Sequence, residues 1–242
     1  MNQLNEENYF KSIRKLKLTR SVSAMKFYLK NLFNEIDLRD KNILDIGAGA
    51  GAYTSYMALN GAKKVIGLEP EIEGSRSNYI SKFNELKEGL NLDNVFLKPL
   101  TFQSFENNEE KFDVILLHHS INHLDEDACI NLNNSNEAKN TYEKIFNKLY
   151  EMSSNDADII VADCSNKNFF SFLGVKNIFS PTIEWHKHQA PEKWTEIMEK
   201  VGYKIIKIEW VVPFRTIGKI FLGNKYCSYF IHSHFVIYAK KQ

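Results

Sequence analysis

A glycine-rich segment near the start of the chain constrains its fold more than any other feature. Residues 42–46 form a short apolar run typical of a buried parallel strand, and the turn Gly47-Ala48-Gly49-Ala50-Gly51 follows at once. Glycine lets the backbone adopt positive φ angles and lets a ligand approach the main chain. Residues 52–60 can then form a helix whose free N–H groups face that ligand. Residues 65–68 predict a second strand, which completes a βαβ unit.

The acidic residue Glu69, at the end of this second strand, indicates what the ligand carries. An acid in this position commonly binds the hydroxyls of a ribose. The spacing Gly-x-Gly-x-Gly differs from the Gly-x-Gly-x-x-Gly pattern that favours a pyrophosphate. Asp45, two residues before the first glycine, would repel an anion and attract a cationic ammonium group. The segment therefore predicts a site for a nucleoside cofactor.

The run Leu44-Asp45-Ile46-Gly47-Ala48-Gly49-Ala50-Gly51 closely resembles the first motif of class I S-adenosylmethionine (SAM) dependent methyltransferases. The resemblance implies SAM as the cofactor and S-adenosylhomocysteine as its product. It also implies that Asp45 and the glycine turn approach the methionine part, while Glu69 binds the ribose hydroxyls. A dinucleotide stays the alternative, because any βαβ unit can carry a glycine turn. The predicted cofactor-binding residues are Asp45, Gly47, Ala48, Gly49, Gly51, Glu69, Pro70, Thr101, Phe102 and His118.

Adenine recognition is the part of the cofactor site where this chain departs from the family. A third strand is expected at residues 94–97, stopped by Pro99. In methyltransferases the loop after this strand often carries an aspartate for the adenine amino group, whereas this chain has Leu100-Thr101-Phe102-Gln103. A backbone contact, Thr101 or Gln103 could replace the aspartate, with Phe102 against the ring.

The remaining elements predict an open α/β fold. Helices are expected at residues 71–88, 136–152 and from Pro191 to Gly202, and further strands at 111–117, 158–162, 203–212 and 233–240. A terminal antiparallel pair closes the sheet of class I methyltransferases. The prediction is a three-layer sandwich with a Rossmann-like, mostly parallel seven-stranded sheet, an antiparallel C-terminal strand and additional N-terminal helices.

A single domain with three parts is expected over residues 1–242. Residues 1–40 would form an N-terminal helical lid, residues 41–165 the SAM-binding core, and residues 166–242 an acceptor cap and the terminal strands. A basic run crosses the lid, and its simplest interpretation is a solvated helix face. Alternatively, Arg14 and Arg20 could bind an anionic acceptor or the SAM carboxylate.

Five of the seven histidines fall in two clusters, His118/His119/His123 and His186/His188. The first cluster directly follows the predicted fourth strand, and ligands bind at the carboxyl ends of strands in open α/β sheets. Histidine is also the usual base at neutral pH. The predicted catalytic residues are His119, His123 and His186, and the predicted substrate-binding residues are Arg14, Arg20, Asn122 and His188. His232 and His234, which flank the last strand, are expected to be structural.

Three other interpretations of these histidines stay open. His118 could finish a strand in the core, and His188 could cap a helix. The two clusters could bind a metal ion together with a carboxylate such as Asp163 or Glu184, but their spacing matches no established ligand pattern, so no metal site is predicted. An already ionised acceptor would need only cations, such as protonated histidine or Lys187, to position it.

The predicted activity is transfer of a methyl group to oxygen. Histidines, and not an Asn-Pro-Pro-Tyr tetrad, stand at the end of the fourth strand, which favours O-methylation of a small molecule, sugar or phosphate-type acceptor. The segments HHSINHL and IEWHKHQ faintly resemble enzymes that modify natural products or capsular polysaccharide. The alternatives are an NAD(P)-dependent oxidoreductase and a non-catalytic SAM-binding protein.

Composition limits the partners and the compartment. The net charge of +1 gives no general attraction to nucleic acid or membranes. No long apolar segment or signal-peptide pattern is present, and the three cysteines are isolated, as in a reducing compartment. We therefore expect a cytoplasmic enzyme with a small-molecule acceptor and neither nucleic acid nor membrane as a partner. The sequence does not indicate an oligomeric state.

Overall fold

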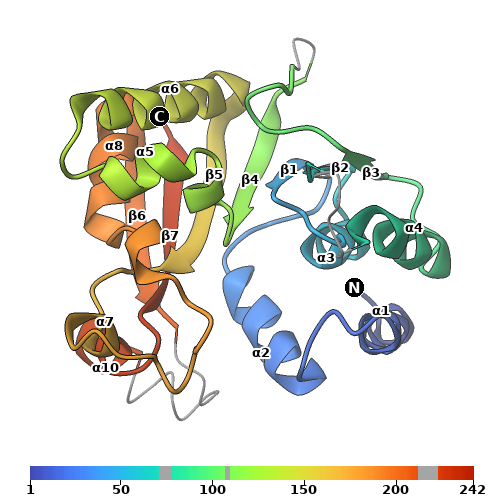
Figure 1. Ribbon diagram of the computed structural model, residues 1–242. Coiled ribbons are helices and arrows are strands. Elements are labelled where there is room, and N and C mark those ends of the chain that lie inside the picture. The colour runs from blue at the N-terminus through green and yellow to red at the C-terminus, as the bar shows by residue number, and fades with distance from the viewer. Residues whose placement is uncertain (71–77, 107–109, 212–222) are drawn as a thin grey trace. The chain divides into compact units, whose positions relative to one another are not determined.

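The computed structural model describes residues 1–70, 78–106, 110–211 and 223–242. Its strands form a seven-stranded sheet in the order β3-β2-β1-β4-β5-β7-β6 (Figure 1). The strands are β1 (Asn42–Ile46), β2 (Lys64–Leu68), β3 (Val95–Lys98), β4 (Phe112–His118), β5 (Ser153–Cys164), β6 (Tyr203–Trp210) and β7 (His234–Lys241). Strands β1, β2 and β3 pair in parallel, and β7 is antiparallel to both β5 and β6. The predicted Rossmann-like, mostly parallel sheet with an antiparallel C-terminal strand is confirmed.

Helices occupy most of the connections between these strands. They are α1 (Gln3–Lys15), α2 (Val22–Leu32), α3 (Ala52–Leu59), α4 (Tyr79–Gly89), α5 (Glu126–Asn131), α6 (Asn136–Met152), α7 (Phe169–Phe172), α8 (Pro191–Val201) and α10 (Lys225–Tyr229), with short 3-10 helices η1 (Ile121–His123) and η2 (Trp185–Lys187). The chain divides into two compact units, unit 1 (Met1–Leu116) and unit 2 (Leu117–Gln242). No helix that the structure describes is long and apolar enough to cross a bilayer.

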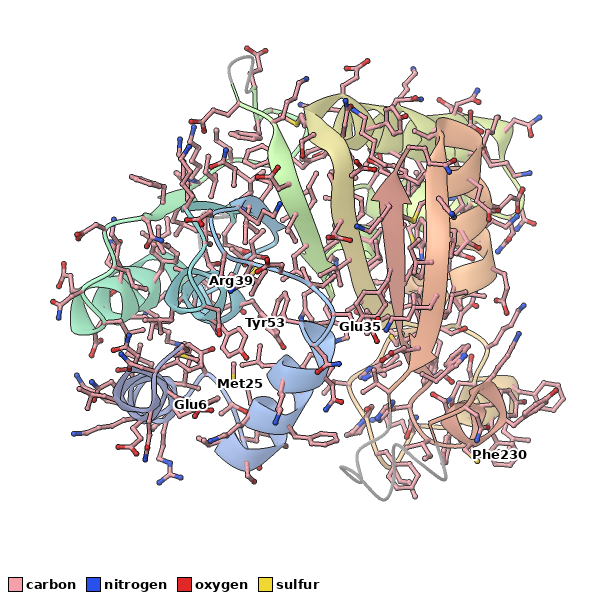
Figure 2. The ribbon with its side chains drawn as sticks, turned by 180° about the vertical axis from the view of Figure 1, so that it is seen from behind. Glu6, Met25, Glu35, Arg39, Tyr53 and Phe230 are labelled. Atoms are coloured by element: carbon pink, nitrogen blue, oxygen red, sulfur yellow. The ribbon has the colours of Figure 1, made fainter. Side chains whose placement is uncertain are left out.

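Unit 1 is built around the βαβ segment that the glycine pattern predicts. The register Asp45↔Gly67 and Ile46↔Leu68 aligns the carboxyl ends of β1 and β2. Helix α1 buries Tyr9 completely, and the Tyr9 hydroxyl donates a hydrogen bond to the Ala52 carbonyl at 2.8 Å. Figure 2 shows Tyr53 of α3 and Met25 of α2 in the space between these two helices. The N-terminal helices therefore pack on the first helix of the βαβ segment.

Unit 2 contains the antiparallel end of the sheet. Figure 1 shows α5, α6 and α8 on one face of β5, β7 and β6. Helix α6 presents an apolar stripe with helical periodicity, and its Tyr142 ring lies 4.9 Å from the Trp194 ring of α8, measured between centroids. Both rings are fully buried. This packing holds the helices that precede and follow β5 against the sheet.

Two strand boundaries and one short helix differ from the sequence prediction. Strand β5 begins at Ser153, before the expected residue 158, in a polar stretch with no alternating apolar pattern. Helix α5 was not predicted; its six residues are too few to show a clear periodicity, and Asp125 caps it by accepting a hydrogen bond from the Ala128 N–H. Strand β6 ends at Trp210. Residues 71–77 of the predicted helix 71–88 and residue 212 of the predicted strand 203–212 lie outside the described residues, as do residues 213–222.

Candidate functional site

The glycine turn of unit 1 has the backbone geometry that its composition predicts. Gly47, Gly49 and Gly51 have φ angles of 77°, 53° and 75°. The N–H groups of Gly47 and Ala48 both donate to the Leu68 carbonyl, at 2.8 and 2.9 Å, which fixes the turn against the end of β2. A Cβ atom added at Gly49 would meet no atom within 4 Å. The turn is therefore anchored on one side and has open space at Gly49.

Glu69 lies beside this turn. Its Oε2 accepts a hydrogen bond from the Gly49 N–H at 2.8 Å, and the side chain is partly exposed. This contact fixes a carboxylate next to the open space at Gly49. Pro70, which follows it, is exposed. The position suits an acid that binds the two hydroxyls of a ribose.

Asp45 is a buried acid directly before the turn. It is 1% exposed, and its Oδ2 accepts a hydrogen bond from the Thr54 hydroxyl at 2.6 Å. The pKa of Asp45 is raised to about 7, mainly by burial and also by the negative charge of Glu69, while the hydrogen bond from Thr54 opposes the shift. A cation placed near these two acids would reverse the effect. Asp45, Glu69 and the glycine turn thus fit a nucleoside that carries an ammonium group.

The residues predicted to contact the adenine lie after β3. Thr101 is exposed, and its hydroxyl shares a hydrogen bond with the Ser104 hydroxyl at 2.9 Å. Phe102 is only 2% exposed, so most of its ring faces the interior of unit 1. Gln103 is exposed. Arg14 in the last turn of α1 and Arg20 before α2, the predicted substrate-binding arginines of unit 1, are also exposed.

In unit 2, polar side chains gather around Asp163, at the carboxyl end of β5. Asp163 is fully buried; its Oδ1 lies 3.1 Å from Nδ1 of His188 and 3.7 Å from Nδ1 of His119. Burial by itself disfavours the charged carboxylate, but the two histidines outweigh this effect and lower the pKa of Asp163 to about 2. The carboxylate is therefore ionised at neutral pH and orients both imidazoles.

The structure separates the five histidines of the two predicted clusters. His119, with a φ angle of 52°, and His188 face Asp163, and His118 ends β4 beside His119, with ring centroids 4.4 Å apart. His123 is exposed on η1, where its Nδ1 lies 3.5 Å from Glu126. His186 is exposed on η2. Among the three predicted catalytic histidines, only His119 contacts Asp163 in the part of the chain that the structure describes.

Sequence reasoning missed that His232 and His234 join this group. The His234 ring lies 5.1 Å from that of His119 and 4.2 Å from that of His232. Burial and neighbouring histidines lower the pKa of His232 to about 4 and also lower that of His234. The register Cys164↔His234 between β5 and β7 creates this proximity. The run His232-Ser233-His234 could have indicated a role near the site. Its position beside His119 follows only from the pairing of β7 with β5, which the sequence does not reveal.

Asn122, a predicted substrate-binding residue, lies on η1 in the loop between β4 and α5, which also carries His119 and His123. It is 1% exposed, and its Oδ1 has no hydrogen-bond partner among the described residues. Tyr142 of α6 holds the same loop, because its hydroxyl lies 2.9 Å from the Ile121 carbonyl and 3.1 Å from the Asp125 carbonyl. The loop that carries His119 and Asn122 is thus tied to the core of unit 2.

A cavity of about 960 Å³ opens in unit 2 beside the segment that carries His188. Gln189 lines it and is 2% exposed; its Oε1 accepts from the amides of Asn133 at 2.7 Å and Asn166 at 3.5 Å. The rings of Phe170 and Trp185 also line the cavity. Its volume lies at the upper end of ordinary ligand pockets, about 300–1,000 Å³.

The charged side chains of this cavity are largely paired with one another. Lys193 lies 2.6 Å from Glu196, and Lys167 lies 3.7 Å from Glu192. Glu184 pairs with Lys187 at 3.1 Å. The lysines therefore do not form a concentrated positive patch. Besides these charged groups, the cavity offers amides and aromatic rings, which bind uncharged polar groups.

Comparison with known proteins agrees with the arrangement of unit 1. The family described as methyltransferase domain matches residues 20–208. A protein from Methanocaldococcus jannaschii, provisionally named as a protein N5-glutamine methyltransferase, is 38% identical over 88 residues, which cover 36% of this chain and 39% of that protein. A tRNA U34 carboxymethyltransferase from Ruthia magnifica subsp. Calyptogena magnifica is 42% identical over 65 residues, which cover 26% of this chain and 19% of that protein. The match spans less than half the length of each relative.

A solved structure extends the likeness to nearly the whole chain. A SAM-dependent methyltransferase from Aquifex aeolicus matches with a TM-score of 0.63 and 16% identity, over 95% of this chain and 98% of that one. At this identity the match bears on the fold, whereas the family match covers well over half of the sequence. The chain belongs to the methyltransferase domain family and has the fold of class I SAM-dependent methyltransferases, which confirms the resemblance in its glycine-rich segment.

Proposed function

We propose that this methyltransferase transfers the methyl group of SAM to a hydroxyl oxygen of a small, uncharged polar acceptor. The observation that carries the choice of oxygen is the buried carboxylate of Asp163 with the imidazoles of His119 and His188 directed at it. A hydroxyl must lose its proton as it attacks a methyl group, and a group of imidazoles around a carboxylate is suited to hold and deprotonate it. An amine acceptor that is already neutral would not need such a group.

The cofactor is held by unit 1 in this proposal. SAM supplies a methyl group already activated by its sulfonium, so alignment of the acceptor supplies much of the remaining rate enhancement. Asp45 would attract the ammonium group of the methionine part, and Glu69 would accept hydrogen bonds from the ribose hydroxyls. The open space at Gly49 supports this assignment, since a side chain there would project toward the ligand. An NAD(P) pyrophosphate would instead meet two acids at the same place.

The acceptor is held by unit 2 in this proposal. The cavity beside His188 offers amides, two aromatic rings and mutually paired charges. This chemistry favours a neutral polar molecule, such as a sugar, over a phosphate-type acceptor or a nucleic acid. His186 lines the cavity, and we propose that it contacts the acceptor without facing Asp163.

A macromolecular acceptor is the second candidate. The relatives with detectable sequence identity carry names for reactions on protein glutamine and on tRNA U34. A macromolecule could insert one residue or one nucleotide into the same cavity. Competition distinguishes the two candidates. An excess of unlabelled macromolecule should inhibit methylation of a macromolecular substrate, whereas small polyols should not.

Methyl transfer from isotope-labelled SAM tests the proposal. Neutral sugars, polyhydroxylated small molecules, glutamine-containing peptides and tRNA would be offered separately, with product detected by mass spectrometry. For the accepted class, His119→Gln should lower turnover by about 100-fold or more, the usual effect of losing acid–base catalysis. Affinity for S-adenosylhomocysteine should stay largely unchanged, because His119 is not among the predicted cofactor-binding residues.

His123→Gln is the informative comparison, because this side chain faces Glu126 and solvent. We expect near-normal turnover from His123→Gln. A loss of turnover in His123→Gln, with His119→Gln unaffected, would contradict our placement of the acceptor. Methylation of glutamine peptides or tRNA alone would instead favour the second candidate.

A further inference from the structure

Asp163 is a buried acid with no lysine or arginine beside it among the described residues. Its side chain is fully buried, and its Oδ2 has no hydrogen-bond partner among the described residues. Within the same residues, no lysine or arginine nitrogen lies within 4.0 Å of it, and its ion-pair contacts are with His119 and His188. Buried charges in proteins are paired or coordinate metal ions. The unpartnered Oδ2 therefore points to a cation as the group that this carboxylate would bind.

The side chains around Asp163 supply a complete set of metal ligands. One ligand atom each from Asp163, Cys164 and His188 lies within 4.8 Å of the other two. Asp163 and Cys164 are buried and His188 is largely so, which separates this cluster from ordinary exposed acidic groups. His119 adds a fourth nitrogen, 3.7 Å from Oδ1 of Asp163. Three side-chain types that commonly bind zinc thus converge at one point.

The spacing of these atoms agrees with tetrahedral coordination. Metal–ligand bonds of about 2.0–2.3 Å at tetrahedral angles place neighbouring ligand atoms about 3.3–3.6 Å apart. The observed separations of 3.1 Å to His188 and 3.7 Å to His119 bracket this range. The second separation is too long for a good hydrogen bond but is ordinary between two ligands of one ion.

We propose that Asp163, Cys164 and His188 bind a divalent transition-metal ion of the zinc type, with His119 beside its fourth coordination position. Sulfur and nitrogen donors favour zinc or cobalt over magnesium or calcium, which prefer oxygen alone. Three protein ligands and one open position are typical of catalytic zinc sites, where water or substrate takes the fourth place. The same Asp163, His188 and His119 carry the proposed O-methylation, but metal binding does not depend on the identity of the acceptor and is tested separately from it.

Cobalt binding to the untagged, full-length protein tests the site directly. The protein would be dialysed against a chelator and titrated with Co²⁺, whose absorption reports both tetrahedral geometry and sulfur ligation. We expect one equivalent to bind, with a sulfur-to-cobalt charge-transfer band, and Zn²⁺ to displace it. Cys164→Ser should abolish that band. Asp163→Asn and His188→Ala should each weaken Co²⁺ binding at least ten-fold.

Two matched variants control for binding elsewhere. Cys227→Ser removes a partly exposed thiol of α10, and Asp158→Asn removes an aspartate of β5 that pairs with Lys240 at 3.3 Å. Both should retain the stoichiometry, affinity and spectrum of the parent protein. Because Asp163→Asn could disturb folding, each variant would also be checked by urea unfolding, and Cys164→Ser provides the spectral test in a variant with little change in volume.

Three results would overturn the proposal. The first is no stoichiometric cobalt binding by the parent protein. The second is binding without a charge-transfer band, and the third is binding that survives in Asp163→Asn, His188→Ala and Cys164→Ser while the controls lose it. In each case Asp163 would serve only to orient histidines, and the cluster would act without a metal ion.

Discussion

Asp45 is a residue of unit 1 whose acidity differs strongly from that of an aspartate in water. It is buried before the glycine turn, and its pKa is raised to about 7. An acid with a raised pKa keeps its proton in the folded state while the unfolded chain has already lost it. The contribution of Asp45 to stability is therefore greatest at low pH and falls as pH rises from about 4 to about 7. Without a ligand, the buried Asp45 carboxylate destabilises the fold at neutral pH. A cationic ligand bound beside it would reduce this cost.

Asp45→Asn should remove this pH-dependent cost. One pKa unit corresponds to about 1.4 kcal/mol, so the cost at pH 8 is up to about 4 kcal/mol. In urea unfolding, the variant should match the parent protein near pH 4 and exceed its stability by about 2–4 kcal/mol at pH 8. Asp93→Asn, at an exposed aspartate of the same unit, should follow the parent curve throughout. Parallel curves for Asp45→Asn and the parent would contradict the raised pKa.

Glu69 allows the ribose contact to be separated from the contact within the turn. Glu69→Ala should weaken S-adenosylhomocysteine binding by about 1.5–3 kcal/mol, the range for hydrogen bonds to a charged group, or roughly 10–150-fold. Glu69→Gln can still accept from the Gly49 N–H and should lose less. Isothermal titration would measure both. Unchanged affinity in Glu69→Ala would show that the ribose lies elsewhere.

At the scale of elements, two glycines of the turn are needed for different reasons. Gly51 is needed for packing, and Gly49 is needed for the approach of the ligand. A Cβ at Gly51 would collide with the ring of Phe83, whereas a Cβ at Gly49 would meet nothing within 4 Å. Both residues have positive φ angles, which cost an alanine about 1–2 kcal/mol. The collision adds about 1–3 kcal/mol at Gly51 only.

Gly51→Ala should therefore destabilise the fold by about 2–5 kcal/mol, and Gly49→Ala by about 1–2 kcal/mol. Gly49→Ala should nevertheless lose most of its affinity for S-adenosylhomocysteine, because its new methyl group occupies the open side of the turn. Urea unfolding and isothermal titration on both variants would measure the two effects. A Gly49→Ala variant that binds normally would mean that the ligand does not approach this glycine.

The loop between β4 and α5 depends on one hydroxyl of α6. Tyr142→Phe would leave the Ile121 and Asp125 carbonyls without the hydroxyl that both contact. We expect a loss of about 1–3 kcal/mol in stability and lower turnover, since the same loop carries His119. Binding of S-adenosylhomocysteine should be unaffected. Phe146→Leu, in the same helix, keeps the core apolar and controls for loss of packing. If Phe146→Leu lowered turnover as much as Tyr142→Phe, the Tyr142 hydroxyl would have no special role.

The elements differ in how much the sequence revealed about them. The βαβ segment was predictable because its apolar runs, glycines and terminal acid lie close together in the chain. Strand β5 was predicted too short, because residues 153–156 are polar and are strand only through contacts at the end of α6. There, Lys241 donates to the carbonyls of Tyr150 and Ser153, at 2.8 and 2.9 Å. Such long-range contacts leave no local pattern.

The candidate site shows the same limit. His119 and His188 were predicted from their places in the chain, and they do converge, on an aspartate that the sequence singled out only as one possible ligand. His232 and His234 were set aside as structural, since only the pairing of β5 with β7 brings them near His119. The roles of all these residues, including His123 and His186, stay predictions. Charge complementarity could not be judged before the partners of each lysine and glutamate in the cavity were known.

At the scale of the whole molecule, the two units carry different parts of the proposed reaction. Unit 1 contains Asp45, the glycine turn and Glu69, whereas unit 2 contains the Asp163 cluster and the cavity. The division into lid, core and cap that the sequence suggests stays a prediction, as does the cytoplasmic location. Cofactor binding serves as the control for substitutions of His119, His123 and Tyr142, because none of these is a predicted cofactor-binding residue.

Cofactor binding is the most direct test of the central claim, that unit 1 binds SAM. Thermal unfolding would be followed with S-adenosylhomocysteine, SAM and NAD(H) added separately to the parent protein and to Asp45→Asn. A ligand at 100 times its dissociation constant stabilises a fold by about 2.7 kcal/mol, an easily measured shift. We expect SAM and S-adenosylhomocysteine to raise the unfolding temperature and NAD(H) to leave it unchanged. In Asp45→Asn the increase should be smaller. A shift with NAD(H) alone would contradict the claim that unit 1 binds SAM.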